Sequence, residues 1–245
     1  MNASAVAAEP VSVVVPVRNE VDNVGPLTEE IRAALRGVVD YEIIYVDDGS
    51  NDGTDEALRA LMQTHPELRT IRHKHSCGQS TAVLTGVRAA RHPWIATLDG
   101  DGQNDPADIP ALLAARGEGA AIPLICGWRR KRKDTWLKRL SSRIANGVRS
   151  RALRDSTPDT GCGLKVFNRA VFLSLPYFDH MHRFLPALVL RAGGKVISVE
   201  VNHRPRVRGK SNYGLHNRLW VGIVDIFGVM WLLRRAKIPV IVESK

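Results

Sequence analysis

The sequence predicts an α/β fold with a mostly parallel central sheet. Short apolar runs rich in Val and Ile alternate with longer helical patterns through the first half of the chain, and this strand–helix repeat is typical of doubly wound sheets. Acids follow two of the apolar runs, as Asp47 with Asp48 and as Asp99 with Asp101. Because ligands of such sheets bind beyond the carboxyl ends of the strands, we expect both acid pairs to face one crevice.

The individual elements follow from the apolar periodicity of each segment. In the first half, strands are expected at 11–17, 41–50, 68–73 and 94–100, with helices at 26–38, 54–65 and 78–91. The helix at 54–65 begins at Thr54, a good N-cap residue, and has acids in its first turn. The second half is less regular, with strands expected at 120–128, 162–168 and 195–206 and helices near 134–152 and at 183–194.

The last predicted element is an apolar helix at 218–235. Residues 219–233 are apolar apart from two glycines and Asp225. Fifteen helical residues reach about 22 Å, short of the roughly 30 Å hydrocarbon core of a bilayer. Arginines flank the run and tryptophans stand near its ends: Arg218, Arg234, Arg235, Trp220 and Trp231. This pattern favours an amphipathic helix that lies in a membrane interface, and a buried core helix is the alternative.

The excess positive charge is confined to one segment. The chain has a formal net charge of +10, and residues 129–154 contain eleven Lys or Arg and a single acid, Asp134. A nucleic-acid surface would interleave aromatic side chains with the basic ones, and this segment lacks that pattern. We therefore predict no nucleic-acid partner and expect the segment to meet another anionic ligand. A solvated loop is the alternative.

The cysteines and the first residues indicate a reducing compartment. Cys77, Cys126 and Cys162 are far apart, odd in number and without paired metal-ligand spacing, which is typical of free thiols. The first nine residues have neither a basic start nor a long apolar run, so no signal peptide is expected.

The stretch LDGDGQNDP at 98–106 gathers three aspartates, Asp99, Asp101 and Asp105. Carboxylates this close raise each other's pKa unless a cation lies between them. A calcium loop that began at Asp99 would need glycine at its sixth position and glutamate at its twelfth, and the chain has asparagine and proline there. We expect Mg²⁺ or Mn²⁺ instead, held by Asp99, Asp101 and Gln103 and shared with the phosphates of a substrate. A pair of turn acids without a metal is the alternative.

Five sequence motifs, spread over residues 13–169, occur in a fixed order. They are VVVPVRNE (13–20), YVDDGSNDGT (45–54), GQSTAVLTG (78–86), LDGDGQNDP (98–106) and GCGLKVFNR (161–169). In this order and spacing they resemble family-two glycosyltransferases with the GT-A (Rossmann-like) fold. The resemblance is closest to the polyprenyl-phosphate branch, which includes dolichyl-phosphate mannose synthases and bacterial undecaprenyl-phosphate sugar transferases. It covers residues 11–215.

The resemblance implies roles for the residues that match the family's motifs. Nucleotide-sugar binding is implied for Pro16, Arg18, Glu20, Asp48, Asp99, Gly100 and Arg183, with Asp48 accepting from the base. Metal binding is implied for Asp99, Asp101 and Gln103. Catalytic roles are implied for Asp101, Arg129 and Arg206, and lipid-phosphate binding for Arg139, Ser142 and Asn146. The family often has Gly-x-Ser-Lys or Gly-x-Ser-Arg where this chain has Asn212, so Lys210 or Arg208 is expected to replace that cation.

The balance of bases and cations favours a phosphate acceptor. Cleavage of a sugar–diphosphate bond needs a stabilised leaving group, which a divalent metal and arginines supply. A hydroxyl acceptor would also need a general base, whereas a phosphate is already ionised at neutral pH. The only acids between Pro158 and Arg183 are Asp159 and Asp179. We therefore predict inverting transfer of one sugar from a UDP- or GDP-sugar to a polyprenyl phosphate of undecaprenyl or dolichyl type. Transfer to a hydroxyl with Asp159 as base is the alternative.

The predicted enzyme would work as a peripheral protein at the cytoplasmic face of the membrane. Its basic segment would be attracted to an anionic membrane surface by about 1 kcal/mol per Lys or Arg, and a membrane-protein partner or a homo-oligomer could add anchoring. The predicted organisation is a disordered N-terminus at 1–10, a GT-A catalytic domain at 11–212, a membrane-interfacial helix at 213–235 and a tail at 236–245.

Overall fold

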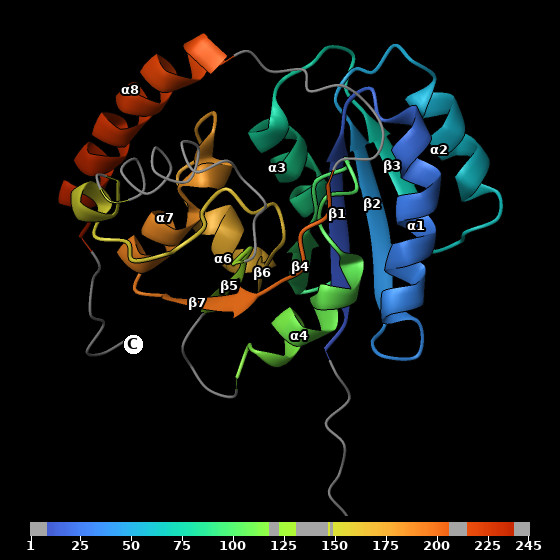
Figure 1. Ribbon diagram of the computed structural model, residues 1–245, viewed down its shortest axis with the longest axis horizontal. Coiled ribbons are helices and arrows are strands. Elements are labelled where there is room, and N and C mark those ends of the chain that lie inside the picture. The colour runs from blue at the N-terminus through green and yellow to red at the C-terminus, as the bar shows by residue number, and fades with distance from the viewer. Residues whose placement is uncertain (1–8, 118–122, 131–146, 148, 206–214, 238–245) are drawn as a thin grey trace, which may run out of the picture.

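The computed structural model describes residues 9–117, 123–130, 147, 149–205 and 215–237. Within these residues, one sheet has the strand order β3–β2–β1–β4–β6–β5–β7 (Figure 1). The strands are β1 (Val11–Val17), β2 (Tyr41–Asp47), β3 (Leu68–Arg72), β4 (Trp94–Thr97), β5 (Pro123–Trp128), β6 (Lys165–Asn168) and β7 (Lys195–Glu200). The helices are α1 (Val21–Leu35), α2 (Thr54–Met62), α3 (Gln79–Ala89), η1 (Pro106–Asp108), α4 (Ile109–Ala114), α6 (Arg169–Ser174), η2 (Met181–Arg183), α7 (Leu185–Arg191) and α8 (Leu215–Arg234).

The sheet is mostly parallel, which confirms the predicted fold class. β1 pairs in parallel with β2 and β4, β2 with β3, and β5 with β7. Only β6, among the described strands, runs antiparallel to its neighbours β4 and β5. The register places Val17 of β1 opposite Asp47 of β2. The carboxyl ends of the first strands therefore meet at one edge, as the sequence predicted.

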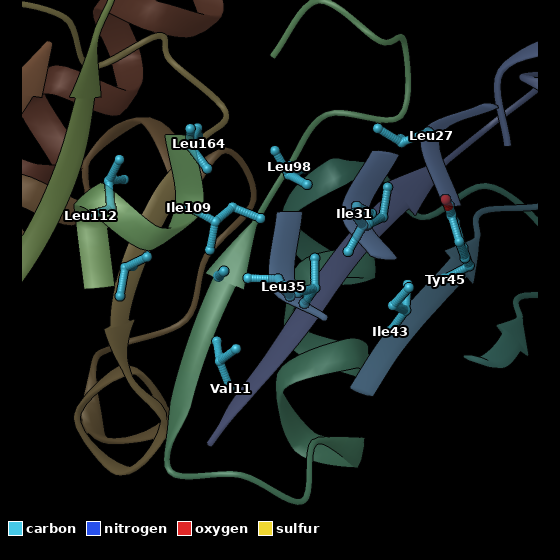
Figure 2. Close-up of a cluster of buried hydrophobic side chains, with 14 of the residues drawn as sticks. Val11, Leu27, Ile31, Leu35, Ile43, Tyr45, Leu98, Ile109, Leu112 and Leu164 are labelled. Carbon is cyan, nitrogen blue, oxygen red and sulfur yellow. The ribbon is translucent and has the colours of Figure 1, made fainter. Parts of the chain in front are cut away.

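Helices cover both faces of the sheet and make two apolar cores. On one face, α1, α2 and α4 pack on the sheet, with Leu27, Ile31 and Leu35 of α1 almost fully buried (Figure 2). On the other face, α3, α6 and α7 pack on the remaining strand residues, and one side of α8 packs on α7. Burial of a Leu or Ile side chain stabilises a fold by about 1.5–3 kcal/mol, so the two cores hold the sheet edge rigidly.

The start of α1 and the N-cap of α2 differ from the prediction. α1 begins at Val21 rather than at Pro26, so the proline lies inside the helix, where it removes one backbone hydrogen bond near the N-terminal end. In α2 the N-cap is Gly53, with a φ of 93°, and Thr54 is the first helical residue. The Thr54 hydroxyl instead donates to Asp52 and accepts from the N–H of Glu20 in the loop after β1, so a tertiary contact has replaced the local cap.

The C-terminal helix α8 has apolar side chains on two sides, so the expected amphipathic pattern is not confirmed. One side packs on α7, where Val229 is 1% exposed and Arg191 donates from Nε to the carbonyl oxygen of Leu232 at 3.0 Å. The other side presents Val224, Phe227 and Trp231 to the surface. The core-helix alternative is therefore right for one side only. A helix that is apolar all round needs an apolar neighbour on each side.

None of the helices in the described residues is long and apolar enough to cross a membrane.

Candidate functional site

The loop after β1 is fastened to the loop after β2. The N–H of Asn19 donates to the hydroxyl of Ser50 at 2.9 Å, and the N–H of Glu20 donates to Oγ1 of Thr54 at 3.0 Å. Asn19 has a φ of 57°, a left-handed conformation that Asn tolerates better than most residues. These bonds place three of the predicted nucleotide-binding residues at the carboxyl edge of the sheet: Pro16, Arg18 and Glu20.

Asp48, at the end of β2, anchors the loop of residues 73–78. Its Oδ1 accepts from the N–H of Cys77 and lies 2.8 Å from Nδ1 of His73. Its Oδ2 accepts from the hydroxyl of Ser76 and the N–H of Gly78. Burial acts to raise the pKa of Asp48, but these hydrogen bonds outweigh it and the pKa is lowered. The carboxylate is therefore ionised and held in place by the loop of residues 73–78.

The acidic loop, residues 99–105, follows β4 and packs against the end of β1. The N–H of Leu98 donates to the carbonyl oxygen of Val14. A Cβ added to Gly100 would lie 2.5 Å from Cγ1 of Val17 and 3.1 Å from the carbonyl oxygen of Pro16, so only glycine permits this approach. Within the loop, the N–H of Gln103 donates to Oδ1 of Asp101 at 3.1 Å. The structure thus brings the β1 and β4 parts of the predicted site together.

Asp99 lies deepest in the acidic loop. Burial raises its pKa and the charge of Asp101 raises it further, while the charges of Lys165 and Arg129 and a 2.7 Å hydrogen bond from Gln79 act in the opposite direction. The net shift is upward, so the positive charge of the described neighbours does not fully compensate this carboxylate. An additional cation would satisfy it.

A strap formed by residues 202–204, just after β7, lies across the acidic loop. Arg204 makes ion pairs with Asp105 at 2.5 Å and with Glu30 of α1 at 2.8 Å, and its N–H donates to the carbonyl oxygen of Gln103. Asn202 donates to Asp108 at 2.7 Å. These contacts join the acidic loop to α1 and to the end of the sheet, and so fix its position.

Arg129 and Asp159 form a bidentate ion pair beyond the end of β5. Nε and Nη2 of Arg129 donate to the two carboxylate oxygens at 2.7 and 2.9 Å. Burial lowers the pKa of Arg129, but the hydrogen bonds and charge of Asp159 outweigh it, so the guanidinium remains charged. A carboxylate held in this way by a guanidinium is a weak base. The arrangement therefore disfavours Asp159 as a general base.

Arg183 is placed by a contact between η2 and the start of α3. Nδ1 of its neighbour His182 forms a 2.7 Å hydrogen bond with the hydroxyl of Ser80. Ser80 follows Gln79, the residue that donates to Asp99. This contact holds η2, which contains Arg183, beside the N-terminal end of α3.

The remaining predicted residues lie outside the described part of the chain. These are Arg139, Ser142 and Asn146 for the lipid phosphate, Arg206 for catalysis, and the substitute cations Arg208 and Lys210 with Asn212. Their predicted roles stay predictions.

Four residues of the site were not predicted individually: Gln79, Gly163, Lys165 and Arg204. Gln79 and Gly163 belong to the motifs at 78–86 and 161–169, and membership in these motifs is the sequence signal for them. Lys165 is 4% exposed and donates to the carbonyl oxygen of Cys162, close enough to Asp99 to lower its pKa. Nothing in the sequence indicates that the strap residue Arg204 reaches Glu30, because 174 residues separate them.

The chain is similar to bacterial polyprenyl-phosphate sugar transferases. It is 36% identical over 228 residues to the dodecaprenyl-phosphate galacturonate synthase of Rhizobium johnstonii, which covers 91% of this chain and 67% of the relative. It is 34% identical to the undecaprenyl-phosphate 4-deoxy-4-formamido-L-arabinose transferase of Edwardsiella ictaluri, over 84% of this chain and 63% of the relative. The chain thus spans about two thirds of the length of these relatives.

Solved structures share the fold at lower sequence identity. Glucosyl-3-phosphoglycerate synthase from Mycobacterium tuberculosis, in complex with Mn²⁺, UDP and glucosyl-3-phosphoglycerate, has a TM-score of 0.65 at 20% identity and covers 95% of this chain and 81% of that one. A mannosyltransferase from Pyrobaculum calidifontis, in complex with GDP-Man and Mn²⁺, has a TM-score of 0.67 at 22% identity, over 96% and 67% of the two chains. The fold is therefore the predicted GT-A fold.

The sequence model of glycosyl transferase family 2 matches residues 12–175. With the two relatives above 30% identity and the shared fold, the match is decisive: the chain belongs to glycosyl transferase family 2.

Proposed function

We propose that this chain transfers one sugar from a nucleotide diphosphate sugar to a polyprenyl phosphate, with inversion at the sugar carbon. The observation that carries the proposal is the 36% identity to a synthase named for dodecaprenyl phosphate and galacturonate. The acidic loop at the carboxyl ends of β1 and β4 is consistent with it. The sugar itself is left open, because the two relatives are named for different sugars.

Asp99, Asp101 and Gln103 would hold Mg²⁺ or Mn²⁺ with the donor diphosphate. Their oxygen atoms are the hard ligands that these ions prefer. Burial and the charge of Asp101 raise the pKa of Asp99, so a bound cation would stabilise its ionised form. A bound dication supplies charge stabilisation for the leaving diphosphate. The proposal also includes the residues predicted to bind the nucleotide sugar: Pro16, Arg18, Glu20, Asp48, Gly100 and Arg183.

The state of Asp159 supports a phosphate as the acceptor. Its two oxygens accept from Arg129, so it is poorly placed to take a proton from an attacking hydroxyl. A lipid phosphate needs no such base, because its oxygens are ionised at neutral pH. Arg129 remains charged and would stabilise phosphate groups near the transferred sugar. Arg206, Arg139, Ser142 and Asn146 are proposed to complete the phosphate contacts.

The transfer experiment uses labelled sugars and separates products by organic extraction. A panel of UDP- and GDP-sugars that includes UDP-galacturonate is incubated with polyprenyl phosphate, with and without Mn²⁺ or Mg²⁺. We expect metal-dependent label in the lipid phase from one donor and none with Asp101→Ala. Label found only in a water-soluble glycoside would overturn the lipid acceptor, and absence of donor consumption across the panel would overturn the transferase proposal.

We infer that α8 rests on the surface of an anionic membrane. Val221, Val224, Phe227 and Trp231 follow one another at helical spacing and are 38%, 68%, 65% and 59% exposed. Arg234 and Arg235 are exposed at the end of this stripe. Apolar side chains beside arginines suit the boundary between acyl chains and anionic headgroups. This proposal also places the helix at the cytoplasmic face of the membrane and after a catalytic domain that ends at residue 212. It includes a membrane-protein partner or a homo-oligomer as an additional anchor.

Removal of the two largest side chains of the stripe tests membrane binding. Phe227→Gln with Trp231→Gln should weaken co-sedimentation with phosphatidylglycerol vesicles by about tenfold or more, since each 1.4 kcal/mol of lost apolar burial is a factor of ten. The matched control is Val38→Gln, which replaces another exposed apolar residue, one that lies just after α1. Equal vesicle binding by the double variant and the wild type would exclude α8 as the docking helix.

A further inference from the structure

A second group of metal-ligating side chains lies at the end of β2, apart from the acidic loop. Ligand atoms of Asp48, His73 and Cys77 all lie within 4.8 Å of one another. Tetrahedral Zn²⁺ bonds of about 2.0–2.3 Å need ligand atoms somewhat closer than this. Cys77 is exposed, and its thiol donates to the carbonyl oxygen of His75 at 3.4 Å. The thiol can therefore turn toward the other two ligands.

The surroundings of His73 and Asp48 match those of a metal site. Nε2 of His73 lies 2.9 Å from the hydroxyl of Thr85, and metal-binding histidines commonly have such a partner on the second ring nitrogen. Oδ2 of Asp48 is fixed by Ser76 and Gly78, which leaves Oδ1 directed at His73. Both ligands are thus oriented before any ion arrives.

The loop that carries Cys77 is held in place by its own packing. The backbone of residues 75 and 76 lies so close to Gly49 that a Cβ there would be 2.9 Å from the nitrogen of Ser76. Gly49 has a φ of 75°, a conformation that glycine adopts without strain. Ordering of the loop is therefore complete before metal binding and adds little entropic cost to it.

We propose that Asp48, His73 and Cys77 form a binding site for Zn²⁺ or a similar borderline metal ion. Thiolate and imidazole ligands select such ions over Mg²⁺ and Mn²⁺, which prefer the all-oxygen set of the acidic loop. Water would occupy the fourth position, as in other sites with three protein ligands.

The protons balance with little rearrangement. In the neutral ring, Nδ1–H of His73 donates to Asp48, whose ionised carboxylate can only accept, and Nε2 accepts from the Thr85 hydroxyl. On metal binding, the ring hydrogen moves to Nε2 and donates to that hydroxyl, so Nδ1 is free for the ion. The thiol of Cys77 releases one proton to solvent. Oδ1 of Asp48 keeps the hydrogen bond from the N–H of Cys77 while it binds the ion.

The consequence is inhibition of the donor site. Asp48 is the residue proposed to accept from the nucleotide base, and this part of the inference rests on the proposed function. An ion that engages Oδ1 of Asp48 would compete with the base, whereas ions at the acidic loop would not.

Titration with Co²⁺ tests the site directly and independently of catalysis. A thiolate-to-cobalt absorption band in the near ultraviolet, reversed by Zn²⁺, is expected for the full chain at one ion per chain. Cys77→Ser should abolish the band, and His73→Gln should weaken binding by about tenfold or more. His75→Gln is the matched control, because His75 is an exposed histidine of the same loop outside the cluster, and it should bind as the wild type does.

The outcomes separate the site from its alternatives. A band that persists in Cys77→Ser would assign the thiolate elsewhere and overturn the proposal, although Cys126 and Cys162 are both buried. Equal affinity of His73→Gln and wild type would reduce the site to a single reactive thiol, which also overturns it. The fold of each variant is checked by its thermal unfolding.

A second experiment measures the effect of Zn²⁺ on nucleotide binding. Zn²⁺ should weaken UDP or GDP binding in the presence of Mn²⁺, and Cys77→Ser should relieve this inhibition. If Co²⁺ binds as expected but Zn²⁺ leaves nucleotide binding unchanged, the proposed role of Asp48 is wrong and the metal site stands.

Discussion

Gly163→Ala is expected to reduce sugar transfer by about 100-fold or more while the chain still folds. A Cβ at Gly163 would lie well inside 3.0 Å of all three carboxyl atoms of Asp99, so the carboxylate has to leave its present position. Overpacking of this kind typically costs about 1–3 kcal/mol of stability. The loss of activity should be larger, because electrostatic stabilisation of a leaving group depends on the exact placement of the charges. The measurements are the steady-state rate with saturating Mn²⁺ and the thermal unfolding temperature.

Gly161→Ala is the matched control for this variant. It lies two residues away in the same segment, where a Cβ would be 3.4 Å from Nη2 of Arg129 and 3.7 Å from Oδ1 of Asp159, which are ordinary contacts. We expect it to keep activity within a few-fold of the wild type. Wild-type activity in Gly163→Ala would show that the position of Asp99 does not matter for transfer.

Asp99→Asn is expected to abolish metal-dependent stabilisation without destabilising the metal-free protein. Burial and the charge of Asp101 raise the pKa of Asp99 above its unfolded value, so at neutral pH the ionised form opposes folding. A neutral amide removes that penalty and can still accept from Gln79. The metal-free Tm should therefore stay the same or rise. The increase in Tm on addition of Mn²⁺ should disappear, and activity should fall by about 100-fold or more.

Asp105→Asn is the control, and its expected effect on the stability of the metal-free protein is opposite to that of Asp99→Asn. Burial acts to raise the pKa of Asp105, but the hydrogen bond from Arg204 and other contacts outweigh it and the pKa is lowered. Its charge thus stabilises the fold above its unfolded pKa, and that stability is lost as the pH falls through the folded pKa. Neutralisation should lower Tm by about 2–4 °C per kcal/mol lost in a chain of this size, while the Mn²⁺-dependent increase persists. A metal response that survives in Asp99→Asn would remove Asp99 from the proposed ligand set.

The local sequence pattern was sufficient to predict the positions of the strands and helices with strong apolar periodicity. The runs at β1, β2 and β3 are short, apolar and rich in β-branched residues, and the structure begins each of them where the sequence predicted. The short helices α4 and α6 were not predicted, because six residues carry too little periodicity to be distinguished from a turn. The antiparallel direction of β6 was also beyond the sequence, since a strand reads the same in either direction.

The sequence placed the acids of the site correctly but could not assign their partners. Asp48 and Asp99 stand at strand ends because the chain alternates strand and helix, and that alternation is a local property. Whether each carboxylate is satisfied depends on distant residues. Hydrogen bonds from loop 73–78 lower the pKa of Asp48, whereas the pKa of Asp99 stays raised despite Lys165 and Gln79.

By itself, the sequence determined the parallel α/β core, the family and the position of the acidic loop at the sheet edge. These depend on apolar period and on motif spacing, both of which are local. Only the tertiary structure decided that Asp159 is paired with Arg129, that Gly163 abuts Asp99, and that α8 presents one apolar side to α7 and the other to the surface. The physical reason is that burial and charge pairing are properties of neighbours in space, and folding brings these neighbours from distant parts of the chain.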